Sequence, residues 1–117
     1  MAKKLLPGNN WAVGVQKVHV GDKFAPDSPT LVDESSKGVE GVELLIELSN
    51  DLAVFDDGSR RFIAVTDSQG KIPMHVIQVI GTESQDDPHK GYFMLTAAML
   101  AKPQIEGVTG SFHIDQP

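Results

Sequence analysis

Histidine is the side chain best suited to acid-base and metal chemistry near neutral pH, and the sequence has four of them. His113 precedes Asp115 by two residues in an alternating segment, so their side chains share a face and can converge on a metal ion. A functional site needs at least three ligands and supporting hydrogen bonds, which this pair does not supply. We therefore expect no cofactor and no metal site, with His113 and Asp115 as the first ligands if a metal is bound.

Two acidic clusters also suggest chemistry, and each has a simpler interpretation. The segment 86–89, Asp-Asp-Pro-His, is the best acid-base candidate, but a solvated turn explains it and no orienting partner can be named. Asp51, Asp56 and Asp57 offer the oxygens that calcium prefers, yet the ligand spacing of a calcium-binding loop is missing. A hairpin turn at Asp57 accounts for them. For His75 we expect a place at a sheet edge or on a covered second face.

Motifs that activate a nucleophile or cradle a phosphate are missing from the sequence. There is no cysteine, and Ser59, Ser68 and Ser111 lack the Gly-x-Ser-x-Gly setting of a strained nucleophile. No Walker-type loop and no dinucleotide-binding glycine pattern occurs. We expect the protein not to be an enzyme.

The clearest structural signal is the stretch 41–50. Val42, Leu44, Ile46 and Leu48 alternate with polar residues at a period of two, which is typical of a half-buried strand. Leu45 interrupts the polar face, which indicates a strand inside a sheet.

Further short strands are expected along the chain, separated by turns. They cover 11–20, 30–32, 52–55, 60–66, 72–80 and 108–114. Tight turns at 56–59 and 67–70 predict a meander of antiparallel neighbours.

One segment, 92–101, fits two structures. Its Tyr-Phe-Met-Leu-Thr run favours a strand, whereas Asp87-Pro88 before it and Lys102-Pro103 after it fit a helix near 88–101. We predict an all-β fold, an antiparallel sandwich or small barrel of about seven or eight short strands with at most one short helix. The alternative is an α+β fold that contains this helix.

The chain of 117 residues is long enough for one domain with its own core. We divide it into an N-terminal arm, 1–10, and a single body, 11–117. Its net charge of −6 repels nucleic acid. The start of the sequence has no signal-peptide pattern, and the longest apolar run is too short to span a membrane. A soluble protein of the cytoplasm or a virion, without nucleic-acid or membrane partners, is expected.

These features together predict a non-enzymatic structural or assembly module that docks on itself, as a homo-oligomer, or on a larger assembly. A capsid decoration, cement or tail protein of a virion would fit. The partner contacts expected are Lys3, Lys4, Trp11 and Phe24; Phe24 lies in the long polar segment 21–41. Alternatives are a sandwich that binds carbohydrate or another ligand, and a metal-dependent enzyme.

Overall fold

The computed structural model describes residues 4–8, 11, 15–81, 91–100 and 105–115, and these ranges contain strands and no helix. The strands are β1 (Lys4–Leu6), β2 (Val15–His19), β3 (Lys23–Phe24), β4 (Thr30–Val32), β5 (Glu43–Leu48), β6 (Ala53–Phe55), β7 (Arg61–Val65), β8 (Ile77–Val79), β9 (Tyr92–Met99) and β10 (Val108–Asp115). The all-β prediction is confirmed. Over these ranges no helix is long and apolar enough to cross a membrane.

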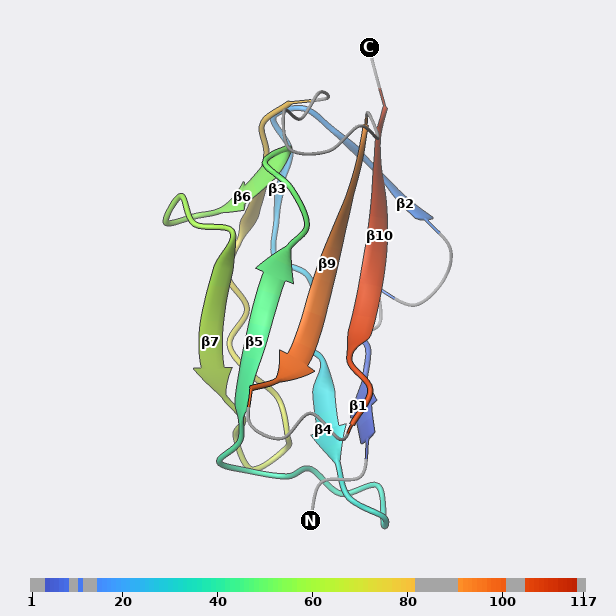
Figure 1. The fold of residues 1–117 in the computed structure, drawn as a ribbon, viewed down its shortest axis with the longest axis vertical. Coiled ribbons are helices and arrows are strands. Elements are labelled where there is room, and N and C mark those ends of the chain that lie inside the picture. The colour runs from blue at the N-terminus through green and yellow to red at the C-terminus, as the bar shows by residue number, and fades with distance from the viewer. Residues whose placement is uncertain (1–3, 9–10, 12–14, 82–90, 101–104, 116–117) are drawn as a thin grey trace.

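Two sheets and a small ribbon build a sandwich (Figure 1). The front sheet has the order β2-β10-β9-β5-β7, the back sheet β3-β8-β6, and β1 pairs with β4. All pairs are antiparallel except β2 with β10, which run parallel. That pair departs from the purely antiparallel arrangement predicted.

The core lies between the sheets and consists of the inward side chains at every second position. Leu44 and Ile46 of β5 are fully buried, as predicted for this strand, and β5 lies between β7 and β9. Facing them from the back sheet are Phe55 of β6 and Ile77 of β8, both buried. Burial of each such side chain contributes about 1.5–3 kcal/mol to the free energy of unfolding.

The ambiguous segment forms strand β9 over Tyr92–Met99, so the helix near 88–101 is wrong for these residues. Phe93, Leu95 and Ala97 are buried, whereas the side chains between them are more exposed. This period of two is that of a strand, because side chains on one face of a helix recur every 3.6 residues. Strands β5 and β10 take up the hydrogen bonds on its two sides. Residues 88–90 and 101 lie outside the described ranges.

The predicted meander is wrong, because successive strands alternate between the sheets. β5 and β7 belong to the front sheet and pair with each other, whereas β6 and β8 belong to the back sheet. The turn 56–59 does form, with Phe55 N–H donating to the Ser59 carbonyl at 2.8 Å, but it joins strands of different sheets. Strand β8 is also shorter than expected, since 72–76 is irregular.

β1 lies inside the segment predicted to be an arm. It pairs with β4, and its Leu5 is buried in the core. β3 is the other strand that was not expected. The division into arm and body stays a prediction.

Asn50 fixes the corner at which the chain passes from β5 in the front sheet to β6 in the back sheet. Its side chain is fully buried. The amide Nδ2 donates to the Tyr92 carbonyl at 2.8 Å, and Oδ1 accepts from Leu52 N–H at 3.0 Å. One side chain thus satisfies backbone groups of β9 and of the corner itself, which would be costly to leave unpaired.

Two turns of the same design lie next to each other, 33–37 and 67–71. In each, the leading carboxylate accepts the amides two and four residues later, at 2.8 and 3.1 Å for Asp33 and 2.8 and 3.0 Å for Asp67. Each carboxyl has a pKa below the ordinary 3.8. The largest contribution comes from the amide four residues later, Lys37 or Lys71, and the next from the amide two residues later. The turns contact closely, since a Cβ on Gly70 would overlap the carbonyl oxygen of Leu31 and approach Gly38 Cα to 3.1 Å.

We expect Gly70→Ala to lower the free energy of unfolding by about 3 kcal/mol or more, because a positive φ of 78° and backbone overlap both oppose a Cβ. Gly58→Ala is the matched control, since Gly58 also has a positive φ, 85°, but has open space around it. It should cost only about 1–2 kcal/mol. Urea denaturation of both variants measures the difference, and equal losses would contradict this account of the turn contact.

Asn50→Asp should lower the free energy of unfolding by about 3 kcal/mol or more at neutral pH, because a carboxylate cannot donate to the Tyr92 carbonyl and buries a charge. The loss should shrink as the pH falls, since a protonated carboxyl regains a donor. Gln69→Glu makes the same chemical change on an exposed side chain and should stay within about 0.5 kcal/mol of the parent. Denaturation at neutral and acid pH tests both.

Candidate functional site

Three potential metal ligands, Asp56, Asp57 and His75, meet beside the turn between β6 and β7. Their ligand atoms all lie within 4.8 Å of one another. The two aspartates belong to the turn 56–59, and His75 comes from the irregular segment that leads into β8. No local spacing in the sequence indicates that His75 lies beside this turn.

His75 is held by an aromatic stack. Its ring lies flat on Phe62, with centroids 4.0 Å apart and planes inclined by 11°, and edge-on to Phe55 at 6.1 Å. Its Nδ1 lies 3.4 Å from Asp56 Oδ1. The histidine is half-buried, and it lies in the irregular segment before β8 and not on the strand predicted over 72–80.

Asp57 is already engaged within its own turn. Its Oδ1 accepts from the Ser59 hydroxyl at 2.6 Å and from the Ser59 N–H at 2.9 Å. The pKa of this carboxyl is lowered mainly by the Ser59 hydroxyl, then by the Ser59 amide, with a further contribution from His75. These hydrogen bonds account for the position of the Asp57 carboxylate within the turn, and both aspartates are exposed.

The predicted ligand pair lies elsewhere, on β10. The His113 ring contacts Tyr92 at a centroid distance of 4.6 Å, and its neighbour across the parallel pair is Lys17 of β2. Asp115 lies across from His19, and its side chain is outside the described part. Within the described residues, the one cluster of three such ligands does not include His113. Segment 86–89 falls outside the described ranges.

Three of the predicted partner contacts, Lys4, Trp11 and Phe24, lie within the described residues. Lys3 lies outside the described residues, and Lys4 is exposed on β1. Trp11 is 1% exposed and packs against Gly110, and its buried indole Nε1 has no hydrogen-bond partner among the described residues. Phe24 is half-buried, 5.6 Å from the Phe112 ring. Their role in partner binding stays a prediction, although the burial of Trp11 makes it a core residue in this structure.

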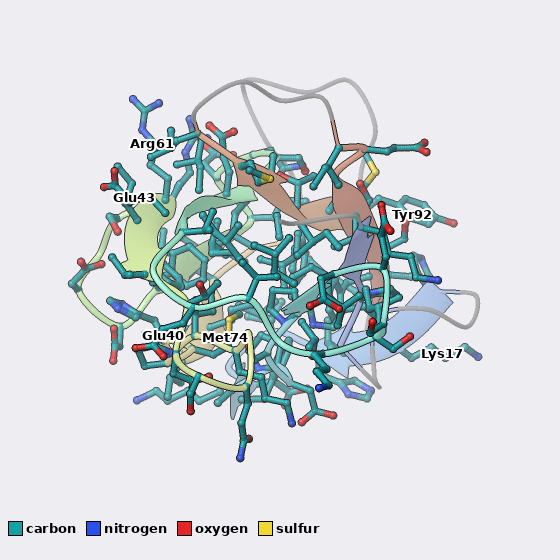
Figure 2. All side chains as sticks on the ribbon, turned by 90° about the horizontal axis from the view of Figure 1, so that it is seen from below. Lys17, Glu40, Glu43, Arg61, Met74 and Tyr92 are labelled. Carbon is teal, nitrogen blue, oxygen red and sulfur yellow. The ribbon has the colours of Figure 1, made fainter. Side chains whose placement is uncertain are left out.

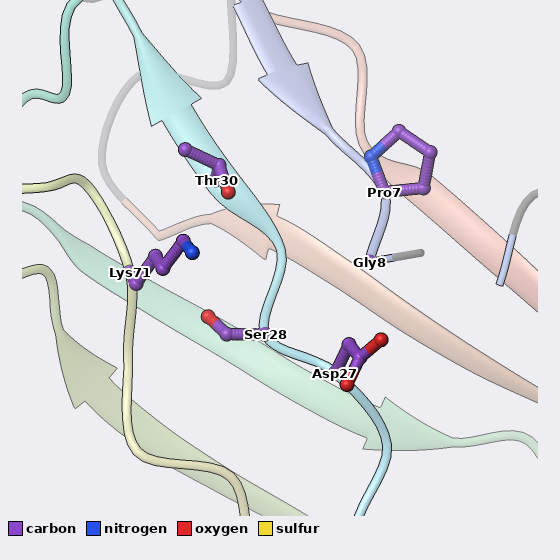
Figure 3. Close-up of a pocket in the computed structure, with 6 residues that line it drawn as sticks. All are labelled: Pro7, Gly8, Asp27, Ser28, Thr30 and Lys71. Atoms are coloured by element: carbon purple, nitrogen blue, oxygen red, sulfur yellow. The ribbon is translucent and has the colours of Figure 1, made fainter. Parts of the chain in front are cut away.

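A polar hollow of about 200 Å³ lies beside β4 (Figure 3). It is lined by Pro7, Gly8, Asp27, Ser28, Thr30 and Lys71. The Ser28 hydroxyl is already used, since it donates to the Pro29 carbonyl at 2.6 Å and accepts from Ile72 N–H at 2.9 Å. Small-molecule sites are lined mostly by apolar side chains, which this hollow lacks.

The feature that sequence reasoning missed is an exposed aliphatic surface on the outside of the front sheet. We call it the outer patch; it comprises Leu45, Ile63, Val65, Ala98 and Leu100. Leu45 stands directly between Ile63 on β7 and Ala98 on β9. Ile63 and Val65 are each 54% exposed. The signal was present in 60–66, where apolar residues occupy both faces of the strand.

Charged residues border the outer patch along β5 and β7. Arg61 lies opposite Glu47, with Nη1 and Oε2 3.8 Å apart, and Glu43 lies opposite Val65. Arg61 and Glu43 project from the same side of the molecule (Figure 2). An apolar surface with a charged rim is typical of a protein-docking surface.

No protein-family model and no curated protein matches this sequence.

We expect Ser59→Ala to raise the pKa of Asp57 toward 3.8, because the hydroxyl is the main group that stabilises the carboxylate. A lowered folded pKa stabilises the protein above the ordinary value, and that stabilisation disappears as the pH falls through the lowered one. The variant should therefore be less stable than the parent at neutral pH. Its stability should also fall less than that of the parent when the pH is lowered. NMR titration of the Asp57 carboxyl carbon measures the shift. The control is Ser68→Ala, which changes an exposed serine of the turn 67–71 at the other end of β7 and should leave the pKa of Asp57 unchanged.

Proposed function

We propose that this protein is a non-enzymatic structural or assembly module that docks on other copies of itself or on a larger protein assembly. The observation that carries the proposal is the outer patch. Soluble proteins seldom expose contiguous apolar surface without using it to bind another surface. Ile63, Val65 and Leu100 are exposed, whereas Leu45 and Ala98 are half-buried. The patch spans the adjacent strands β7, β5 and β9, and Leu100 follows directly after β9, so a rigid sheet presents these side chains in a fixed arrangement.

The chemistry of the described residues supports the same proposal. The group of three potential metal ligands found among the described residues includes Asp57, whose carboxylate accepts hydrogen bonds within its own turn. The net charge of −6 disfavours a nucleic-acid partner. A role in a virion, as a capsid decoration, cement or tail component, or in a cytoplasmic assembly, fits a small sandwich that works through its surfaces.

Replacing Ile63 and Val65 together by threonine should weaken self-association at least about 10-fold, since each aliphatic carbon lost from a buried contact costs about 0.8 kcal/mol. Threonine is a good strand former, so the fold should persist. The control replaces Val20 and Ile80, which are 50% and 49% exposed and lie outside the outer patch. Light scattering on a size-exclusion column, from micromolar to millimolar concentration, measures the mass. A parent chain that stays monomeric throughout would contradict self-docking.

A carbohydrate-binding sandwich is the second candidate, and exposed Tyr92 is the observation that favours it. Tyr92 is 47% exposed and lies beside His113, and a sugar-stacking aromatic must be exposed in this way. Glycan-array binding that is lost in Tyr92→Ala would support this candidate over docking.

A further inference from the structure

We propose that the open edge of β7 pairs with β7 of a second copy, antiparallel and centred on Ile63, so that two front sheets join into one continuous sheet. The inference rests on the proposed function, since it names the surface through which self-docking occurs. The pairing is isologous, with the same residues contributed by both copies around a two-fold axis.

The backbone of β7 is ready for such a partner. Leu48 N–H bonds the Arg60 carbonyl at 2.8 Å, and Thr66 N–H bonds the Val42 carbonyl at 2.9 Å. Antiparallel pairs alternate between bonded and non-bonded positions, so even-numbered residues of β7 bond to β5. The N–H and C=O groups of the odd-numbered residues 61, 63 and 65 therefore point away from β5, on the side where no further strand of the described residues pairs with β7. The Arg61 carbonyl accepts from the Ser59 hydroxyl at 3.0 Å and has a second lone pair for a partner strand.

This edge has few of the features that usually protect an edge strand, since its one charged residue is Arg61 at the start. Exposed edges are ordinarily very short, or carry lysine, proline or a bulge. The back sheet follows this rule, since its edge strands β3 and β6 have 2 and 3 residues. The other edge of the front sheet, β2, carries exposed Lys17. β7 has 5 residues, and from Phe62 to Val65 it carries neither charge nor proline.

Centring the pair on Ile63 also joins the two outer patches. Ile63 of one copy then lies opposite Ile63 of the other, with Leu45 next to each on its own β5. The aliphatic surface becomes one stripe across both sheets. This register uses the backbone groups of all three odd-numbered residues in each strand, because residue 61 meets residue 65. A shift of two residues in either direction leaves some of them unpaired.

The charges favour the antiparallel orientation. Arg60 and Arg61 lie at the start of β7, whereas Asp67 and Glu43 lie at its end. Antiparallel pairing places Arg61 of one copy beside Val65 of the other. Glu43 of that second copy lies on the far side of its Val65, in β5. Two strand spacings are about 10 Å, which extended arginine and glutamate side chains can span. Parallel pairing would instead place arginine next to arginine.

Cysteine cross-linking tests this register directly, because the chain has no cysteine of its own. Opposite residues of a bonded antiparallel pair have Cα atoms about 5.5 Å apart, within the range a disulfide bridges. Under mild oxidation Ile63→Cys should form covalent dimers. Arg61→Cys and Val65→Cys should form few alone but should cross-link with each other when mixed. The matched control is Ile80→Cys, whose parent residue is 49% exposed, and it should form few.

Light scattering on Ile63→Lys supplies a second measurement. Two ammonium groups would meet at the two-fold axis, so we expect the dissociation constant to rise at least about 10-fold. Ile80→Lys should leave it unchanged. Ile63 is 54% exposed, and circular dichroism checks that the variant remains folded.

The outcomes separate this inference from the proposed function. A parent oligomer in which Ile63→Cys cross-links no better than Ile80→Cys would overturn the β7 pairing while leaving self-docking intact. Arg61→Cys that cross-links efficiently with itself would indicate either parallel strands or an antiparallel register centred on residue 61, and each would overturn the proposed pairing. A parent chain that is monomeric at millimolar concentration would overturn both the β7 pairing and self-docking, and would leave docking on a larger assembly as the remaining form of the proposed function.

Discussion

A buried amide at the corner between the sheets is the constraint on which the sandwich depends. Asn50 connects the end of β5 to the start of β9 through the Tyr92 carbonyl and closes its own corner through Leu52. Next to it, Ser49 N–H donates to the Met94 carbonyl, and the Ser49 hydroxyl accepts from Met94 N–H. The corner thereby fixes the register of β9 on β5. It also directs the chain into the back sheet, which supplies the second wall of the core.

Strand positions and inward faces could be predicted because they follow from alternation within a few residues. Leu44, Ile46 and Leu48 are buried as their spacing predicts, and Phe93 and Leu95 resolve β9 in the same way. Strand partners could not be predicted, because a tight turn at Asp57 looks the same whether it joins neighbours or crosses between sheets. The crossing is decided by contacts distant in sequence. From its sequence neighbours, Asn50 is indistinguishable from an ordinary turn residue.

Sites were harder to predict than strands for the same reason. Asp56 and His75 come together because β7 leaves for the front sheet and the chain then returns, and no local spacing encodes that path. Trp11 was expected to be available to a partner, but its contact with Gly110 is set by the distant strand β10. The apolar outer face of β7 could have been predicted, because Ile63 and Val65 alternate with Phe62 and Ala64, so that both faces of the strand are apolar.

The parallel pair of β2 and β10 joins residues 15 and 111, nearly the whole length of the chain apart. β10 also lies between β2 and β9, so a segment distant in sequence fills an interior position of the front sheet. The entropy of closing so long a loop is lost before the contacts between the two strands form. We therefore expect slow folding for a domain of this size. During translation, β9 keeps an unpaired edge until residues 108–115 leave the ribosome. The front sheet therefore assembles late, and its incomplete form is the species most exposed to misassociation.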